Sequence, residues 1–442
     1  MTETSSSSAP RVAQVLLDVS LPHLDRTFDY AVPEALDTEA VPGTRVRVRF
    51  AGRKVNGFIV QRSDHSEHAG KLASLDSVVS SEPVLTPAIA QVIRRVADHY
   101  AGSVADVLRL AIPSRHAKVE AEPLAPFVPV EATPFTDASP WQHVEHSEQF
   151  LSELEQGRPV RAVIAVPPSL SIAELIAQAA RQTRGDASHD RGKSVLVVVP
   201  DHRDVDHIAH VLAAHLPFDC VTTLTADVGP AKRYRQWLKI LRGQSRVVVG
   251  TRASMFAPVS DPGLLVIVDD GDDLHAEPHA PYPHVREVLA IRSMSESAGL
   301  LVIGRIQTAE GERLVRSGWA HSLTPIREFV RSHSPRVHTI GSDAELERDP
   351  GAVSARLPSV ALRTARAGLE SGPVLVQVAR AGYLPVVACQ DCRQVAHCDN
   401  CHGPLRLSGA GRAPSCGWCG TVRAQHVCAS CGGSTLRAVR IG

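Results

Sequence analysis

Long apolar runs are missing from this sequence. No stretch of about 18 or more apolar residues occurs among its 442 residues, so no transmembrane helix is expected. The opening stretch MTETSSSSAPR has neither the basic region nor the apolar core of a secretory signal, and its composition is typical of a short disordered tail. We therefore expect a cytoplasmic protein.

Cysteine is absent before Cys220, and the other eight of the nine cysteines lie between residues 389 and 431. Thiols crowded in this way in a reducing compartment are metal ligands more often than disulfides. They form four Cys-x-x-Cys pairs: Cys389/Cys392, Cys398/Cys401, Cys416/Cys419 and Cys428/Cys431. Such a turn brings two thiolates to the spacing that tetrahedral zinc requires. The sequence therefore predicts two zinc ions with four thiolates each, closed to substrate and structural.

The spacing leaves the pairing of these turns open. A nested arrangement joins the second pair with the third and the first pair with the fourth, whereas a sequential arrangement joins neighbouring pairs. His397, His402 and His426 adjoin the turns and are alternative ligands.

The chain also has no net charge, because 47 basic residues balance 47 acidic ones. Its overall charge therefore gives no reason to expect nucleic-acid binding. Local charge is more informative. Arg45, Arg47 and Arg49 alternate along a predicted strand and therefore project from one face, next to Arg53 and Lys54. This basic stripe suits phosphate contacts, and a solvated strand face is the alternative interpretation.

The apolar pattern divides the chain into regions. Alternating β-branched residues predict strands at 12–19, 45–50 and 54–62, followed by a helical stretch at 86–110, so residues 11–112 form a small β-rich domain. Residues 113–145 have the composition of a linker or reduced domain. Residues 146–385 alternate apolar strands with helices, which indicates a parallel sheet covered on both faces. Its predicted strands are 161–166, 194–199, 246–249, 264–268, 300–303 and 374–378, with helices such as 203–215 and 230–242.

Several segments resemble one family, the PriA replication restart proteins, which are relatives of superfamily 2 DNA helicases. The resemblance rests on the cysteine spacing with VQVARAGYLPVVAC before it, on LPHLDRTFDYAVPE and PGTRVRVRFAGRKVNGFIV, and on VVVGTRASMFAPVSDPGLLVIVDD. It implies a 3′-DNA-end-binding domain at 11–112 and a reduced winged-helix region at 113–145. A RecA-like helicase lobe follows at 146–385, then a two-zinc module at 386–436 and the start of a missing second lobe at 437–442.

The resemblance also implies a pocket for a terminal 3′-hydroxyl. It maps onto Phe28, Asp29 and Tyr30, then Gly52 and Lys71. An aromatic ring can stack on the last base, and a carboxylate can accept a hydrogen bond from the hydroxyl. Phe28 and Tyr30 are core residues in the alternative interpretation.

The chain departs from the family at its nucleotide site. A phosphate-binding loop needs glycines, a lysine and a Ser/Thr hydroxyl, but here Ser171 replaces the lysine, Ile172 replaces the hydroxyl, and two prolines remove N–H donors. Only Asp269 and Asp270 remain of the acidic box, since Gly271 and Asp272 follow them. Asp269 retains a carboxylate for magnesium, while a solvated acidic turn is the alternative. The coupling motif has become Gly-Arg-Ile-Gln-Thr at 304–308.

These observations predict a DNA-binding replication restart protein that recognises stalled or abandoned forks and nucleates primosome assembly without helicase activity. The alternatives are an active ATP-dependent 3′–5′ DNA helicase and a zinc-ribbon interaction protein without DNA affinity. The expected cofactors are two structural Zn2+ ions, with ATP and Mg2+ not expected to bind. The expected partners are forked DNA with a 3′ nascent-strand end, primosome proteins and single-strand-binding proteins. No membrane is involved, and the expected location is the nucleoid.

Overall fold

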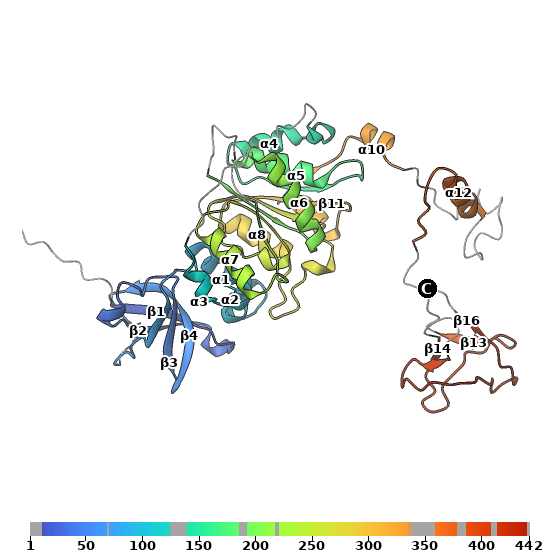
Figure 1. The fold of residues 1–442 in the computed structure, drawn as a ribbon, viewed down its shortest axis with the longest axis horizontal. Helices are drawn as coiled ribbons and strands as arrows, with labels where there is room; N and C mark the ends of the chain where they lie inside the picture. Colours follow the sequence, from blue (N-terminus) through green and yellow to red (C-terminus); the bar gives the residue numbers. More distant parts are fainter. Residues whose placement is uncertain are drawn as a thin grey trace, which may run out of the picture. The chain divides into compact units, whose positions relative to one another are not determined.

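The computed structural model describes residues 11–68, 70–123, 139–184, 192–216, 221–335, 337, 359–377, 386–407 and 413–439. Figure 1 traces the chain from its N-terminal strands to its cysteine-rich end. By its contacts the chain forms two units, Met1–Pro335 and Arg336–Gly442, and each is described by itself.

The first unit begins with a five-stranded antiparallel sheet in the order β2-β1-β4-β3-β5. Its strands are β1 (Val12–Leu17), β2 (Thr27–Ala31), β3 (Arg45–Phe50), β4 (Arg53–Ser63) and β5 (Ser77–Ser80). A bridge between Ala31 and Ser74 brings the chain before β5 back beside β2, so the sheet curls into a small barrel. Ala51 and Gly52 both have positive φ and form the two-residue turn between β3 and β4.

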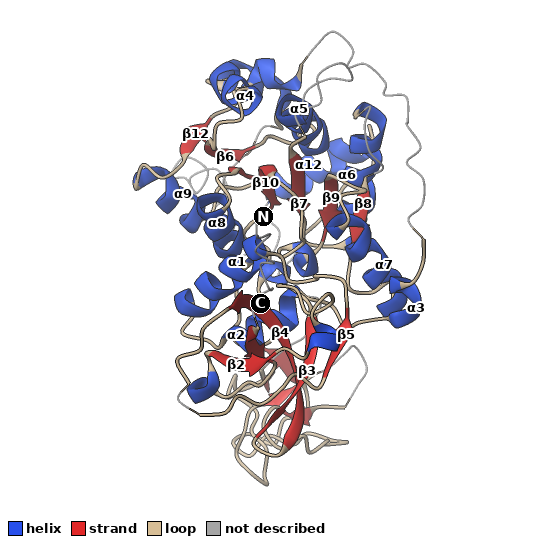
Figure 2. Cartoon of the chain, turned by 90° about the vertical axis from the view of Figure 1, so that its left-hand side faces the viewer, coloured by secondary structure: helices blue, strands red, loops and turns tan. Residues whose placement is uncertain are grey.

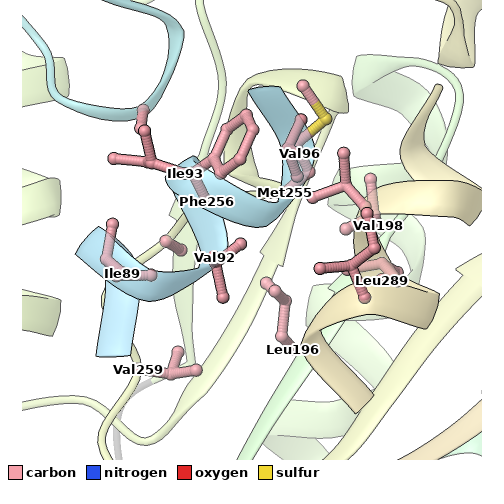
Figure 3. Close-up of a cluster of buried hydrophobic side chains, with 14 of the residues drawn as sticks. Ile89, Val92, Ile93, Val96, Leu196, Val198, Met255, Phe256, Val259 and Leu289 are labelled. Carbon is pink, nitrogen blue, oxygen red and sulfur yellow. The ribbon is translucent and has the colours of Figure 1, made fainter. Parts of the chain in front are cut away.

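Two helices follow the barrel, α1 (Pro87–His99) and α2 (Val104–Ala111). The sequence predicted one helical stretch here, but Ala101 has positive φ and the Ser103 side chain caps a new helix by accepting from the Asp106 N–H. The predicted apolar face of α1 is buried, with Val92 and Val96 0% exposed. Figure 3 shows that this face packs against side chains of the following lobe.

The lobe is built on a seven-stranded parallel sheet in the order β12-β6-β11-β10-β7-β9-β8. Its strands are β6 (Arg161–Ala165), β7 (Ser194–Val198), β8 (Thr222–Leu224), β9 (Val247–Gly250), β10 (Pro262–Val268), β11 (Gly299–Gly304) and β12 (His321–Leu323). Figure 2 shows β6, β10, β7, β9 and β8 in this order across the sheet, with β11 between β6 and β10. The fold class predicted from the sequence is confirmed, although the short strands β8 and β12 were missed.

Alternate residues of the strands contribute to two separate hydrophobic cores, one on each face of the sheet. Leu196 and Val198 pack with α1, α7 and α8, whereas Val195 and Val197 pack with α4, α5 and α6. The lobe helices are α4 (Ser147–Glu155), α5 (Ile172–Arg184), α6 (His202–His215), α7 (Pro230–Leu241), α8 (Val285–Ser295), α9 (Ala309–Arg316) and α10 (Arg327–His333).

The region predicted as a linker contributes to this unit. Residues 117–120 form the short helix α3, and Val119 is buried. Trp141, within the short helix η3 (Pro140–His143), is 1% exposed and donates from its indole N–H to the Leu175 carbonyl, 3.0 Å away. Residues 124–138 lie outside the described residues, and the domain boundaries proposed from the sequence stay predictions.

The second unit contains α12 (Ser359–Leu369) and two small sheets. Strand β13 (Val387–Cys389) pairs with β16 (Leu436–Ala438), and β14 (Leu405–Arg406) pairs with β15 (Ser415–Cys416). The strand predicted at 374–378 is wrong over 374–377, because those residues form no strand and Leu375 is 91% exposed without a neighbouring strand among the described residues. None of the described helices has the length and apolarity needed to cross a membrane.

Candidate nucleic-acid interface and metal centres

A cavity of about 720 Å3 opens at one end of the barrel, between β2, the end of β3 and the segment after β4. We call it the barrel cavity. Phe28 lies edge-on to Phe50 at 4.9 Å between ring centroids, and the Arg26 guanidinium lies 5.0 Å from the Phe28 ring. Asp29 accepts a hydrogen bond from the Ser66 hydroxyl at 2.6 Å, which fixes the carboxylate at the wall.

Five of the residues predicted from the sequence line this one cavity: Phe28, Asp29, Tyr30, Arg49 and Lys71. Tyr30 is only 3% exposed, belongs to the barrel core, and donates from its hydroxyl to the Arg49 carbonyl at 3.2 Å. Burial raises the pKa of Tyr30. Phe28 is half-buried, so it offers more of its ring to a ligand than Tyr30 does.

Gly52 lies in the turn beside the barrel cavity without lining it. A Cβ atom at this position would meet nothing within 4 Å, while its φ is +78°. The left-handed backbone of the turn, rather than a close approach, therefore accounts for the glycine here.

The three predicted arginines of β3 do project from one face, since Val46 and Val48 between them are buried. Their surroundings differ. Arg45 turns inward, donating from Nη2 to the Pro113 carbonyl at 2.6 Å, and burial lowers its pKa. Arg47 and Arg49 are exposed.

The loop after β6, which corresponds to the phosphate loop, is occupied by a side chain of the chain itself. Arg305 donates from Nη1 to the carbonyl oxygens of Pro167 at 2.7 Å, Leu170 at 3.0 Å and Val166 at 3.4 Å. A phosphate loop presents N–H groups to an anion. This loop instead presents carbonyl oxygens to a cation.

Two residues, Ser171 and Ile172, align with the lysine and the magnesium-binding hydroxyl of a phosphate loop, and both contribute to the fold. The Ser171 hydroxyl accepts from the Glu174 N–H at 3.3 Å at the start of α5. Ile172 is 9% exposed and packs in the core beneath the sheet. Ile172 offers no polar group, and the Ser171 hydroxyl takes part in the first turn of α5.

Asp269 and Asp270 both accept hydrogen bonds from neighbouring residues. Asp269 has a φ of +50° and accepts from the Arg305 backbone N–H at 2.9 Å. Asp270 is 4% exposed and accepts from Arg286 Nη1 at 2.9 Å and from the Thr308 hydroxyl at 2.8 Å. Sequence patterns did not indicate the contacts of Arg286 and Arg305, because their partners lie 16 residues away for Arg286 and Asp270, and 135 to 139 residues away for Arg305 and the loop carbonyls.

The eight cysteines form two groups, and within each group the sulfur atoms lie within 4.8 Å of one another. The groups are Cys389/Cys392/Cys428/Cys431 and Cys398/Cys401/Cys416/Cys419, which is the nested arrangement. Sulfur-to-sulfur distances of 3.4 to 3.8 Å match the edge of about 3.8 Å expected for a tetrahedron with Zn–S bonds of about 2.3 Å.

Backbone geometry supports thiolate ligands in the second of these groups. The N–H groups of Trp418 and Cys419 point to the Cys416 sulfur at 3.3 and 3.5 Å. The hydroxyl of Thr421 lies 3.1 Å from the Cys419 sulfur, and together with the Thr421 backbone N–H and the Cys401 thiol it lowers the pKa of Cys419 to about 6. The three alternative histidine ligands take no part in either group. The donor set therefore fits two closed tetrahedral sites, while Cys220 lies outside the described residues.

Residues 14–113 match the family described as "3'DNA-binding domain (3'BD)" of PriA. This match covers the barrel, α1 and α2. Together with the parallel-sheet lobe and the two cysteine groups, it defines a helicase-like, metal-binding protein with a DNA-end-binding domain.

Named relatives resemble this chain over most of its length. The "Probable replication restart protein PriA" of Mycobacterium tuberculosis is 48% identical over 96% of this chain and 64% of its own length. That of Mycobacterium leprae is 45% identical over 96% of this chain and 65% of its length. The "Replication restart protein PriA" of Treponema pallidum is 22% identical over 91% of this chain. The chain belongs to the PriA family, and it spans 64–65% of the length of these mycobacterial relatives.

Proposed function

We propose that this protein binds the 3′ end of a nascent strand at stalled or abandoned replication forks and acts as a scaffold for primosome assembly, without helicase activity. The match to a 3′ DNA-binding domain and the names of the relatives support the first part. Primosome and single-strand-binding proteins would be its protein partners, in the cytoplasm at the nucleoid.

The contact between Arg305 and the former phosphate loop carries the second part. Three carbonyl oxygens converge on one guanidinium nitrogen, so the loop surface that would meet a triphosphate is electronegative. Pro167 and Pro168 have no N–H to offer in its place. A nucleotide would have to break the contacts of Arg305 and then face carbonyl oxygens, which repel phosphate.

ATP hydrolysis in the presence of forked DNA tests this part. We expect the wild-type protein to show no turnover above that of Asp269→Asn, and no saturable binding of a fluorescent ATP analogue. DNA-stimulated turnover that Asp269→Asn abolishes would show an active helicase site and overturn the proposal.

Fluorescence anisotropy with forks that end in a 3′-hydroxyl or in a blocked 3′ end tests the first part. We expect tighter binding of the free 3′-hydroxyl, because the Asp29 carboxylate can accept a hydrogen bond from it. Equal affinity for both forks would contradict recognition of the DNA end.

We propose zinc for the two cysteine groups because four thiolates at tetrahedral spacing suit this ion. Metal analysis should return about two zinc ions per chain. Cys392→Ser and Cys416→Ser should each lose about one ion, from different groups, whereas Cys220→Ser should lose none. Loss of no zinc from either variant would refute the assignment.

A further inference from the structure

A second cavity, of about 560 Å3, lies beside the barrel, between the hairpin β3–β4 and the end of α2. Four guanidinium groups line it: those of Arg45, Arg47, Arg109 and Arg115. We call it the arginine cleft. Among the described residues that line it, Asp18 is the only acid. No residue carried over from the family resemblance suggested a site at α2.

The charges in the arginine cleft do not balance. Arg109 donates to Asp18 at 2.7 Å, and Arg115 donates to Glu120 at 2.7 Å. Arg45 donates to a neutral carbonyl, and Arg47 has only a long contact of 3.4 Å to the neutral Asn56 amide. Arg109 also lies 3.9 Å from the Asp106 carboxylate. Four cations therefore meet three carboxylates, which leaves an excess of about one positive charge.

The guanidinium groups also affect one another. Burial lowers the pKa of Arg45; the nearby Glu120 raises it, and the smaller effect of the Arg115 charge lowers it. The side chains of Arg109 and Arg115 keep 48% and 31% of their surface exposed despite their ion pairs, so N–H donors remain for a ligand. Cations that converge on a solvent-filled cavity without full compensation favour a polyanion as the ligand.

Three apolar residues, Phe58, Leu108 and Ile112, also line the arginine cleft, with Asn56 and Ser114. Each of the three is at most 6% exposed, so the arginines and other polar groups form most of the surface that a ligand can reach. The choice of ligand therefore rests on the connection to the barrel cavity, where the end of a DNA strand is proposed to bind. A polynucleotide chain can reach both places, whereas an isolated inorganic ion cannot.

One β-strand, β3, connects the arginine cleft to the barrel cavity. Arg45 and Arg47 line the arginine cleft, and Arg49, on the same face of β3, lines the barrel cavity. Four residues of extended chain separate the Cα atoms of Arg45 and Arg49 by about 13 Å. At about 3.4 Å per stacked nucleotide, this span corresponds to about four nucleotides.

We propose that the arginine cleft binds the phosphodiester backbone of the same DNA strand whose 3′ end enters the barrel cavity, about four nucleotides upstream of that end. This inference rests on the proposed function, since it extends the path of the bound strand. It adds a contact that does not depend on the terminal hydroxyl.

The affinity of the protein for 3′-hydroxyl oligonucleotides of increasing length, labelled at the 5′ end, tests the path. We expect affinity to rise from dinucleotide to octanucleotide and to level off once the cleft is filled. Arg47→Ala and Arg115→Gln should each weaken octanucleotide binding about fivefold, and reduce the slope of log affinity against log salt by about one. Neither variant should change dinucleotide binding.

Arg95→Ala is the matched control, because Arg95 is exposed on α1 and lines neither cavity. Arg47 is exposed, so its variant folds even if Arg115→Gln does not. The cleft is ruled out if Arg47→Ala retains the octanucleotide affinity and salt slope of the control, or if wild-type affinity does not rise with length. Dinucleotide binding that survives Asp29→Ala would instead count against the proposed function.

Discussion

The predicted nucleotide site, formed by Arg305, Asp269, Asp270 and the loop after β6, and the barrel cavity use charged residues in opposite ways. In the predicted nucleotide site, Arg305, Asp269 and Asp270 all bond to groups of the chain itself. In the barrel cavity, Arg49 and Lys71 line open space and form no side-chain hydrogen bond or ion pair with other described residues.

This difference separates stability from binding. A buried charge that is fully paired contributes to the folded state only as long as its partner remains, and offers nothing to a ligand. An exposed charge contributes little to stability but remains available. Substitutions in the nucleotide site should therefore change stability and leave DNA affinity unchanged, with the reverse in the barrel cavity.

The largest effect is expected at Asp270. Asp270→Asn removes the closer of the two carboxylates beside Arg286, which is itself only 7% exposed; the other, that of Glu287, lies 3.4 Å from its Nε. Breaking this buried ion pair while the second carboxylate remains should cost about 3 kcal/mol of the free energy of unfolding, the lower end of the range for an uncompensated buried charge. Thermal and urea denaturation would measure this loss.

The double variant Asp270→Asn/Arg286→Met serves as the control, since it removes both charges and should recover part of the loss. Fork affinity of the folded Asp270→Asn protein should match that of the wild type. A variant that keeps its stability but loses fork affinity would break the distinction between the two regions.

Arg305→Ala should have a smaller effect. It removes the guanidinium from three carbonyls but keeps the backbone N–H bond to Asp269. Because Arg305 is exposed, we expect a loss of about 1–2 kcal/mol, together with faster hydrogen exchange over residues 166–172. Differential calorimetry and exchange mass spectrometry would detect both.

Arg327→Ala, another exposed arginine beside this loop, should change neither quantity. The loop should remain unable to bind ATP in Arg305→Ala, since the prolines and carbonyl oxygens persist. Nucleotide affinity that appears in Arg305→Ala would mean that the arginine alone blocks an otherwise intact site.

The sequence was informative where local pattern determines structure. Alternation at 45–50 predicted β3, and the apolar run at 264–268 predicted a central buried strand, because burial on one or both faces sets these patterns. It could not decide the pairing of the cysteine turns, since nested and sequential sites have the same spacing.

The contacts of Arg305 and Arg286 could not be predicted from the sequence either. Arg305 lies 135 to 139 residues from the carbonyls that it contacts, and Arg286 meets Asp270 only because α8 packs beside the end of β10. Such contacts depend on how distant elements approach, and no local period encodes that. The sequence predicted a changed phosphate loop, but not the contacts that Arg305 makes with its carbonyl oxygens.

Asp29→Ala tests the same distinction in the barrel cavity. It removes a partly exposed carboxylate whose one hydrogen-bond partner at the cavity wall is Ser66. We expect a change of less than about 0.5 kcal/mol in stability, but about tenfold weaker binding of 3′-hydroxyl DNA, because a charge-assisted hydrogen bond is lost. Anisotropy titrations with free and blocked 3′ ends should then give the same affinity.

Asp64→Ala is the matched control, because it removes the same charge from an exposed residue that does not line the barrel cavity. It should keep the preference for a free 3′-hydroxyl. If Asp64→Ala and Asp29→Ala weaken binding equally, the effect of Asp29 is one of overall charge rather than of a specific contact.

The smallest effect concerns pH and His284, whose side chain caps the start of α8 by accepting from the Arg286 N–H. Burial lowers the pKa of His284 from 6.5 to about 4. Between these values the unfolded chain binds a proton that the folded protein does not, so the stability is present above about pH 6.5 and is lost as the pH falls towards 4. His284→Gln should flatten this acid decline in melting temperature, whereas His210→Gln, on the exposed side of α6, should not. An unchanged decline in His284→Gln would show that other groups account for the acid sensitivity. DNA affinity at constant folded fraction should not respond to either substitution.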